Sequence, residues 1–417
     1  MADLSVKYAG MDFKNPLVGG SGPNYDSIEG CTAAAEAGFS GFVLKSIASR
    51  SLGRFAYQHA VPRYKIVERL DHSKRWRPES GSDNMDVVFA GEVGSTWSET
   101  DYVEFARKVM RDLGGKVKVA ASAYFARDPQ ERDRQLDLLA NCNTDFIELP
   151  LTNDFFSSTD VAQWVKKAKD KIKVPLTVKL CSTFEFPVVE RVKMLEDAGI
   201  DGVTMFDAAV ALDIDIETMQ TPFRDTWNSV AGGVTVPWLS RQVALCRLAG
   251  VKIPITASCG VSEWRHVIKL ILCGADAVQV CRKVMVRGYA IAGEWLEEIN
   301  TWLDERSIEN ITDLKGKILD NLDDRYRKVA REEPLERGGI PTLKADINRS
   351  RCGGCENWCA PGCSYFAIRR NGYKVEIDND KCAVCGQCEG ACPFSAISYR
   401  KRLPNETPKR TTSQKAH

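Results

Sequence analysis

The sequence predicts an α/β fold, a (β/α)8 TIM barrel followed by a small C-terminal domain built around eight cysteines. From residue 15 to about residue 300, short apolar segments alternate with amphipathic segments of helical period, the pattern of a parallel sheet with crossover helices. Further along, eight of the chain's 15 cysteines fall between Cys352 and Cys392. A chain of 417 residues has room for both domains.

Eight apolar segments suit a closed barrel better than an open, doubly wound sheet. No GxGxxG motif follows the first segment, which argues against a dinucleotide-binding Rossmann domain. Amphipathic helices are predicted between the strands, for example at 27–38, 131–142, 187–199 and 263–275. We expect strands at residues 15–21, 41–46, 118–124, 146–151, 175–180, 202–206, 254–258 and 277–281.

Two stretches interrupt this repeat, residues 50–85 after the second strand and residues 208–236 after the sixth. Both begin where barrel strands end, on the face where barrel active sites are built, so they are candidate walls or lids. Between Arg50 and Arg77 the first carries eight basic residues, two acidic ones and several aromatic ones. It is either a solvated surface insertion or a segment that docks an anionic substrate or a partner.

Composition argues against several classes of protein. Lys and Arg total 57 against 56 for Asp and Glu, so net charge favours neither a nucleic-acid-binding nor a membrane-surface protein. The N-terminus lacks a basic region followed by an apolar stretch, and no apolar run approaches the roughly 18 residues of a spanning helix. Secreted disulfide scaffolds are short chains. We therefore expect a cytoplasmic protein whose clustered thiolates bind metal.

The second cysteine group has the spacing of a bacterial ferredoxin half-site. Cys382, Cys385, Cys388 and Cys392 follow the pattern C-x2-C-x2-C-x3-C, and Pro393 comes directly after them. Such a group holds a [4Fe–4S] cluster, which transfers single electrons. The spacing therefore predicts a redox protein.

The first cysteine group is less regular, because its spacing is C-x2-C-x3-C-x3-C and no proline follows it. The segment 373–378 between the groups matches the strand that ferredoxins place there. Paired C-x2-C motifs also make tetrahedral zinc sites, an alternative that the ferredoxin repeat disfavours. In two-cluster ferredoxins the fourth cysteine of each group binds the other cluster. That rule assigns one cluster to Cys352, Cys355, Cys359 and Cys392, and the other to Cys382, Cys385, Cys388 and Cys363.

Glycine, hydroxyl and basic residues lie at the ends of the predicted barrel strands. They are Gly20, Ser21 and Gly22 after the first strand, Lys45 and Ser46 after the second, Lys179 in the fifth, Ser258, Cys259 and Gly260 after the seventh, and Cys281 and Arg282 after the eighth. In this order, and with the cysteine groups behind them, these motifs resemble the FMN-binding barrel of the dihydroorotate dehydrogenase and dihydropyrimidine dehydrogenase family. The resemblance runs from about residue 10 to about residue 400.

The resemblance implies FMN and two [4Fe–4S] clusters as cofactors, with all of these strand-end residues near the flavin. Loops after strands seven and eight form the usual phosphate site of a barrel, so Gly260 and the Cys281–Arg282 turn would hold the FMN phosphate. Gly232 and Gly233 resemble the family's glycine pair after strand six. Lys179 would stabilise negative charge on the reduced flavin ring, and Lys45 would lie near flavin and substrate. The alternative for either lysine is a snorkelling side chain at a strand end.

The chain departs from the family after strand four, where relatives carry a pattern close to E-x-N-x-S-x-P. Pro150 occupies the position of the substrate-contacting Asn, Thr152 that of the Ser, and Asn153 that of a catalytic residue in one branch. An amide does not exchange a proton near neutral pH. After strand six, Asp207 replaces another substrate-contacting Asn. FMN chemistry is therefore expected, whereas pyrimidine chemistry is not.

Asp207 is the preferred proton donor, because burial over a flavin can shift the pKa of a carboxyl toward neutrality. The alternative is a structural carboxylate that caps the segment after strand six. Lys45 and Lys179 complete the expected catalytic group. Other candidate donors on this face are Thr152, Asp154, Ser157, Cys181 and His59.

The expected organisation is a barrel at 1–305, a helical linker at 306–345, a two-cluster ferredoxin-like domain at 346–400 and a disordered tail at 401–417. We expect an oxidoreductase that passes electrons between the clusters and FMN to reduce or oxidise a C–C bond of a small substrate. Its partner would be a ferredoxin or an FAD-bearing, NAD(P)H-oxidising subunit. Assembly into a homo-oligomer is a further option. The alternatives are a non-catalytic electron-transfer subunit of a larger complex and a true dihydropyrimidine dehydrogenase.

Overall fold

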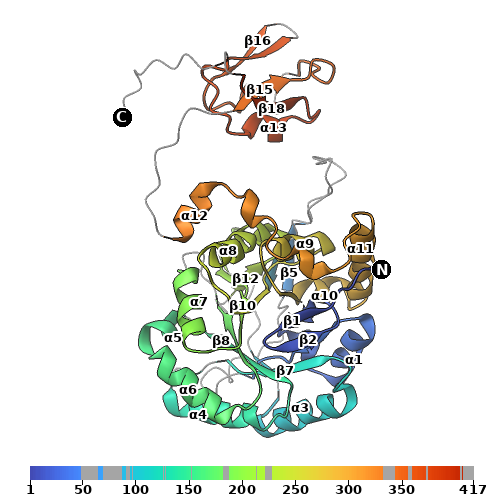
Figure 1. Cartoon of the computed structure of the whole chain (residues 1–417), viewed down its shortest axis with the longest axis vertical. Helices are drawn as coiled ribbons and strands as arrows, with labels where there is room; N and C mark the ends of the chain where they lie inside the picture. The colour runs from blue at the N-terminus through green and yellow to red at the C-terminus, as the bar shows by residue number, and fades with distance from the viewer. Residues whose placement is uncertain are drawn as a thin grey trace. The chain divides into compact units, whose positions relative to one another are not determined.

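Eight parallel strands close into a barrel in the computed structural model, as the sequence predicts (Figure 1). Each strand pairs with the next one in chain order, and β14 returns to pair with β3. The strands are β3 (Leu17–Gly19), β4 (Gly41–Val43), β7 (Lys118–Ser122), β8 (Phe146–Leu151), β9 (Leu176–Leu180), β10 (Gly202–Met205), β13 (Ile255–Ala257) and β14 (Ala277–Val280).

The chain divides into two compact units, one of Met1–Leu70 and Asp83–Pro334 and one of Asp71–Ser82 and Leu335–His417. The structure describes residues 1–47, 64–68, 87–90, 94–95, 97–124, 126, 128–151, 153–181, 187–212, 214–220, 228–331, 343–355, 359–371, 374–403 and 406.

Helices follow the strands and surround the barrel (Figure 1). Local sequence sets their ends: the hydroxyl of Ser27 accepts a hydrogen bond from Gly30 N at the start of the first helix, and Gly38 ends it with φ 106°. Within the described ranges, no helix combines the length and apolarity needed to cross a membrane. The helices are α1 (Ile28–Ala37), α3 (Glu99–Leu113), α4 (Pro129–Ala140), α5 (Asn153–Ser158), α6 (Val161–Lys171), α7 (Val188–Asp197), α8 (Val236–Leu248), α9 (Trp264–Leu272), α10 (Arg282–Arg287) and α11 (Ile291–Asp304), with 3-10 turns η1 (Pro23–Tyr25) and η2 (Gly233–Thr235).

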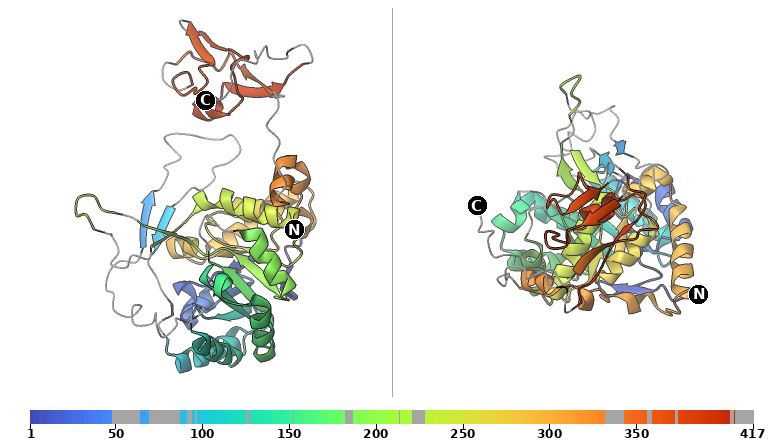
Figure 2. Two further views of the ribbon diagram at one scale, coloured as in Figure 1. Left: turned by 90° about the vertical axis from the view of Figure 1, so that its left-hand side faces the viewer. Right: turned by 90° about the horizontal axis from the view of Figure 1, so that it is seen from above.

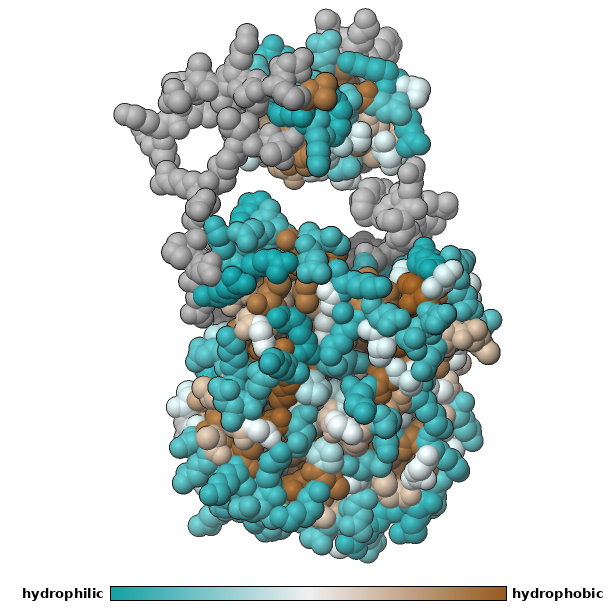
Figure 3. Space-filling view, viewed as in Figure 1, coloured by the Kyte–Doolittle hydropathy of each residue, from teal (hydrophilic) through white to brown (hydrophobic). Residues whose placement is uncertain are grey.

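The barrel strands are buried along their whole length because helices cover one face and the barrel interior the other. Every residue of β8 and β9 is buried. A hairpin of β1 (Val6–Tyr8) and β2 (Met11–Phe13) packs against the N-terminal end of the barrel, where a Cβ on Gly202 would lie 2.9 Å from the Tyr8 ring. Outside this core, hydrophilic residues cover most of the visible face of the barrel unit (Figure 3).

The two interruptions of the repeat join in one antiparallel sheet of order β11-β12-β6-β5. The first supplies β5 (Tyr64–Glu68) and is followed directly by β6 (Val87–Ala90), and the second supplies β11 (Ala209–Ala211) and β12 (Asn228–Ala231). Strands β12 and β6 pair directly, so segments far apart in sequence build one wall. Most of the basic stretch between Arg50 and Arg77 lies outside the described residues.

A buried ion pair holds the N-terminal end of the barrel together. Arg247, near the end of α8, lies 2.8 Å from the carboxylate of Asp276, which precedes β14. The same guanidinium donates to the carbonyl oxygens of Gly274, Val251 and Ile253. The two charged side chains are only 9% and 11% exposed, so neither is screened strongly by water.

Replacing Asp276 with Ala should lower the free energy of unfolding by about 3–5 kcal/mol, because it leaves a buried guanidinium unpaired. The matched control is Asp112→Ala, which breaks an exposed pair with Lys108 at 3.0 Å and should cost no more than about 0.5 kcal/mol. Urea unfolding followed by circular dichroism measures both. Equal effects would contradict the role assigned to Arg247.

After α11 the chain forms η3 (Ile311–Leu314), η4 (Leu319–Asn321) and α12 (Asp324–Ala330). These elements belong to the first unit, although the sequence predicts a linker here. Backbone hydrogen bonds from Gly316 and Ile318 to the end of α9 attach this segment to the barrel.

The second unit contains two small antiparallel sheets. Strand β15 (Leu343–Ile347) pairs with β18 (Ile397–Lys401), and β16 (Ile368–Asn371) pairs with β17 (Lys374–Ile377). The predicted strand between the cysteine groups is therefore present. One short helix, α13 (Gln387–Ala391), lies within the second cysteine group.

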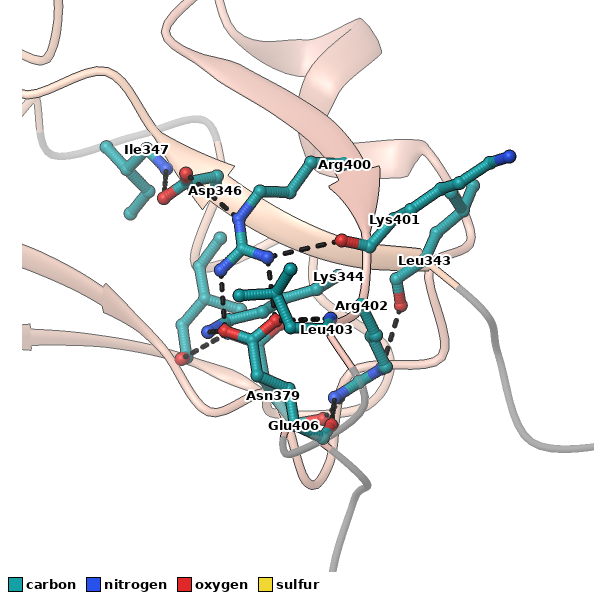
Figure 4. A network of polar contacts seen from close by, with 11 residues as sticks. Leu343, Lys344, Asp346, Ile347, Asn379, Arg400, Lys401, Arg402, Leu403 and Glu406 are labelled. Carbon is teal, nitrogen blue, oxygen red and sulfur yellow. Dashed lines mark hydrogen bonds and ion pairs between the residues drawn. The ribbon is translucent and has the colours of Figure 1, made fainter.

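Residues 401–403 and 406 belong to this unit, although the sequence predicts a disordered tail from residue 401. The carboxylate of Glu406 accepts from Arg400 at 2.6 and 2.7 Å and from Lys344 at 2.9 Å (Figure 4). Arg402 donates to the backbone of Leu343. The fold therefore continues past residue 400, and the last tail residues lie outside the described ranges.

Candidate functional site

The predicted site residues gather at the C-terminal end of the barrel because each lies in or directly after a strand. Loops after parallel strands meet at one end of a barrel. The residues are Gly20–Gly22 after β3, Lys45 and Ser46 after β4, Lys179 in β9, Asp207 after β10, Gly232 and Gly233 after β12, Ser258–Gly260 after β13, and Cys281 and Arg282 after β14.

Two loops, one after β12 and one after β13, meet closely around Gly260. A Cβ on this glycine, whose φ is +95°, would lie 2.2 Å from Gly232 O and 2.1 Å from Thr235 Oγ1. The Thr235 hydroxyl donates to Gly232 O at 2.9 Å and to Cys259 O at 3.1 Å. The structure thus brings together the two glycine segments that the sequence places in separate loops. Their packed backbones leave no room for a side chain at residue 260.

The loops after β3 and β14 meet in the same way. A Cβ on Gly22 would lie 2.3 Å from Cys281 Sγ, and one on Gly20 would lie 3.4 Å from Cys281 Cβ. Beyond Cys281, Arg282 donates to the backbone oxygen of Ser229 at 3.1 Å and to its hydroxyl at 2.5 Å. Arg282 therefore links the last barrel strand to β12 of the antiparallel sheet.

A row of hydroxyls connects the ends of β3, β4 and β7. Ser21 and Ser46 are 2.9 Å apart through their Oγ atoms, and Ser46 and Ser122 are 2.8 Å apart. Ser46 N also donates to the Ser21 hydroxyl at 2.9 Å. These contacts fix the backbone on either side of Lys45.

Both predicted lysines are buried, with 4% exposure for Lys45 and 5% for Lys179. Neither is a snorkelling side chain, because snorkelling leaves the ammonium group in water. Lys179 makes no hydrogen bond or ion pair within the described part of the chain. Burial lowers the pKa of Lys179, but the charges of Asp207 and Glu148 raise it by more, so the net shift is upward and the side chain stays charged.

Asp207 does not have the raised pKa that burial alone predicts. Burial alone would raise it, but the positive charges of Lys179, Lys45 and Arg282 and a hydrogen bond from Ala208 N at 2.9 Å hold the pKa of this carboxyl below its usual value. Asp207 is therefore an ionised carboxylate among three cations. A group in this state is not a proton donor near neutral pH.

A second buried carboxyl, on Glu148 of β8, is missing from the sequence prediction. It accepts from the Thr204 hydroxyl at 2.5 Å and from Gln279 Nε2 at 2.6 Å inside the barrel, and its other oxygen has no partner among the described residues. Burial raises the pKa of Glu148, and Lys179 partly opposes the shift. The signal in the sequence is one charge within the apolar run FIELPL.

The remaining proton-donor candidates divide into three groups. Cys181 is half-buried next to β9, and burial followed by the charge of Asp207 raises its pKa above the usual range, so it stays a thiol. Ser157 is exposed on α5. Thr152 and His59, and the side chains of Asn153 and Asp154, lie outside what the structure describes. Pro150 lies within β8 opposite Lys179 of β9.

In the second unit, four cysteines line one pocket: Cys363 of the first group with Cys382, Cys385 and Cys388 of the second. This is the crossed set that the ferredoxin rule assigns to one cluster. Within the described residues, no three His, Cys, Asp or Glu side chains are grouped for a single metal ion. The thiols instead surround a space bounded by Ile368, Ile377, Tyr399 and other apolar side chains.

Part of the second crossed set is also drawn together. Burial, and then the charges of Cys355 and Cys392, raise the pKa of the Cys359 thiol, so Cys355 and Cys392 each lie within electrostatic reach of Cys359. Cys352 packs against the small apolar core that contains Cys359. Cys392, from the other group, thus lies near Cys359 of the first.

The two cysteine groups share one backbone pattern despite their different spacing. Ala367 N donates to Cys363 Sγ at 3.3 Å, and Ala396 N donates to Cys392 Sγ at 3.4 Å. At the other end of each group the contacts match again, with Cys352 N bonded to Asn348 O at 3.0 Å and Cys382 N bonded to Asp378 O at 3.0 Å. The described ends of the two groups therefore make the same backbone contacts.

A family model described as a 4Fe–4S binding domain matches residues 375–398. The catalytic subunit of dihydroorotate dehydrogenase B (NAD(+)) from Exiguobacterium sibiricum is 24% identical over 325 residues, which are 76% of this chain and 97% of that protein. The PreA subunit of NAD-dependent dihydropyrimidine dehydrogenase from Escherichia coli K12 is 21% identical over 375 residues, 85% of this chain and 84% of that protein. These homologues confirm the resemblance drawn from the motifs.

Dihydroorotate dehydrogenase A (fumarate) from Lactobacillus helveticus is 29% identical over 158 residues, which are 38% of this chain and 50% of that protein. In this comparison the chain therefore spans half the length of its relative. The chain is thus similar to dihydroorotate and dihydropyrimidine dehydrogenases along most of its length, and to a 4Fe–4S binding domain near its C-terminal end.

Proposed function

We propose that this chain is an iron–sulfur flavoprotein that passes electrons between two [4Fe–4S] clusters and FMN and reduces or oxidises a C–C bond of a small substrate. FMN exchanges a hydride with the substrate carbon, and the clusters carry single electrons. The observation that carries the proposal is the crossed grouping of Cys363 with Cys382, Cys385 and Cys388, because crossed ligation is particular to two-cluster ferredoxins.

The barrel residues fit FMN. Backbone at Gly260 is packed too closely against Gly232 for a side chain, which leaves peptide groups to face a phosphate. The buried ammonium of Lys179, without a hydrogen-bond partner among the described residues, suits the anionic edge of a reduced flavin. Lys45 and Arg282 would add positive charge for the flavin and a substrate.

We propose a small anionic substrate that is not a pyrimidine. Lys45, Lys179 and Arg282 are the cations that act on Asp207, and these three positive charges outnumber the carboxylates even when Glu148, which acts on Lys179, is counted. Pro150 opposite Lys179 has no side-chain amide with which to read a pyrimidine ring. Bleaching of the flavin by dihydrouracil or dihydrothymine would instead identify a dihydropyrimidine dehydrogenase.

Electrons would come from a ferredoxin or from an FAD-bearing, NAD(P)H-oxidising subunit. One relative is itself named as a subunit of an NAD-dependent enzyme. The 209–220 segment is a candidate surface for binding such a partner, because it projects from the barrel unit (Figure 2). Its apolar side chains face solvent, with Ile216 81% and Met219 85% exposed, and patches of this kind often mark protein contacts. A second copy of the chain would be an alternative occupant.

A non-catalytic electron-transfer subunit is the second candidate function. The observation in its favour is the replacement of the family's substrate-reading side chain by Pro150 within β8. The two buried lysines favour an enzyme, because Lys179 alone suits the reduced flavin and Lys45 leaves a second cation for a substrate. Anaerobic reoxidation of the reduced flavin by a panel of unsaturated acids separates the two. Failure with the whole panel, together with a stable copurifying complex, would support the electron carrier.

Anaerobically purified protein should contain one FMN and about eight irons per chain, because two crossed cysteine sets hold two [4Fe–4S] clusters. Cys363→Ser should reduce the iron content to about four while FMN stays bound. Cys142→Ser, which changes a buried cysteine in the barrel, is the control and should keep all the iron. Iron assay and the visible flavin spectrum measure these contents; four irons in the unaltered chain would remove one cluster from the proposal.

A further inference from the structure

The two cysteine sets have matching backbones but different surroundings. By the internal repeat, Ile397 corresponds to Ile368, so Tyr399 of β18 corresponds to Arg370 of β16. Tyr399 lines the pocket of Cys363, Cys382, Cys385 and Cys388, and its hydroxyl lies 3.7 Å from Cys388 Sγ. Arginine at the equivalent place cannot provide the same hydroxyl. The repeat is therefore broken at a position that touches a cluster ligand.

Solvent exposure also separates the sets. Cys385 is exposed. In the other set Cys359 and Cys392 are each only 8% exposed. Among the described contacts, Val384 N also donates to Cys382 Sγ of the exposed set at 3.4 Å, whereas the Ala367 contact of this set is matched by that of Ala396 in the other.

We propose that Tyr399 tunes one of the two clusters, so that the solvent-facing set of Cys363, Cys382, Cys385 and Cys388 holds the cluster of higher reduction potential. The inference rests on the proposed function, since it assumes that both sets are loaded. A cysteine bound to iron is a thiolate, so the hydroxyl of Tyr399 is the donor. Hydrogen bonds to sulfur and solvent exposure both stabilise the more negative, reduced cluster. Both factors act on the same set.

A consequence is that electrons exchanged with an outside carrier settle first on the solvent-facing cluster. Its ligand Cys385 reaches the surface, and two aromatic residues beyond Cys363, Tyr365 and Phe366, are exposed. The cluster of the other set, which contains Cys359 and Cys392, then receives its electrons from the solvent-facing cluster. Because the solvent-facing cluster has the higher potential, the other cluster becomes reduced only after the solvent-facing one is reduced.

The test is a redox titration of the anaerobically purified full chain, followed by electron paramagnetic resonance. The unaltered chain should show two midpoint potentials. Tyr399→Phe removes only the hydroxyl and should lower the higher potential, with up to a tenfold loss in the equilibrium constant for reduction, about 59 mV for a one-electron couple. The lower potential should stay unchanged.

Tyr365→Phe is the matched control, because Tyr365 lines the same pocket without a sulfur contact among those described. It should leave both potentials unchanged. Tyr399→His keeps a donor and should return the higher potential toward its original value, which separates a lost hydrogen bond from a disturbed fold. Two unchanged potentials in Tyr399→Phe, or a shift of the lower one, would overturn the inference. An iron content of four would instead defeat the proposed function before any titration.

Discussion

Replacing Gly260 with Ala should abolish FMN binding while leaving the barrel folded. The new Cβ would lie 2.1 Å from Thr235 Oγ1 and 2.2 Å from Gly232 O, and one of these two contacts is with backbone that cannot rotate away. The φ of +95° adds strain for any residue with a side chain. The loops after β12 and β13 would have to separate, and with them the peptide groups proposed to hold the phosphate.

The matched control is Gly250→Ala. Gly250 has a similar φ of +85°, but a Cβ there meets nothing within 4 Å, so the change carries the backbone strain without the clash. We expect Gly250→Ala to keep its affinity for FMN. Gly260→Ala should lower that affinity at least about 100-fold, which corresponds to roughly 3 kcal/mol of binding free energy. Flavin fluorescence on dilution measures the affinity. Equal retention of FMN by both variants would remove Gly260 from the flavin site.

The sequence predicts the barrel well because each of its strands carries a local signal. All eight expected segments contain strands, and the fully buried β8 and β9 show why: a parallel strand is buried on both faces, so most of its residues are apolar. The antiparallel sheet has no such signal. Its pairing of β6 with β12 joins two interruptions more than a hundred residues apart, and neither contains the regular strand–helix repeat.

The candidate site shows the same difference between features that local sequence predicts and features that depend on distant residues. Motif order is enough to bring Gly232 to Gly260 and to place Lys45 and Lys179 at one end of the barrel. The charge state of Asp207 is different, because it depends on three cations from other strands and loops that no local pattern connects. Burial alone suggested a raised pKa for this carboxyl, and the assembled site lowers it.

Asp207→Asn should reveal which role the carboxylate has. An ionised Asp207 raises the pKa of Lys179, against the lowering effect of burial. The amide keeps a side-chain oxygen for Ala208 N but removes the negative charge, so the pKa of Lys179 should fall. Lys179 would then lose its proton at a lower pH, and with it the positive charge proposed to stabilise reduced FMN.

The measurement is the midpoint potential of bound FMN between about pH 6 and pH 10, a range below the ordinary lysine pKa of about 10.4. The variant should match the unaltered chain at low pH and fall below it as the pH rises, because only the charged lysine favours the reduced flavin. Asp215→Asn changes a carboxylate in the exposed 209–220 segment and should follow the unaltered curve.

Turnover distinguishes this counter-ion role from the proton-donor role expected from the sequence. If Asp207 holds Lys179 in its charged form, the variant should retain turnover at low pH and lose it on the alkaline side. If Asp207 supplies the proton, turnover should vanish at every pH while FMN stays bound and its potential is unchanged. The lowered pKa of Asp207 favours the first result, since a carboxyl that is already ionised has no proton to give.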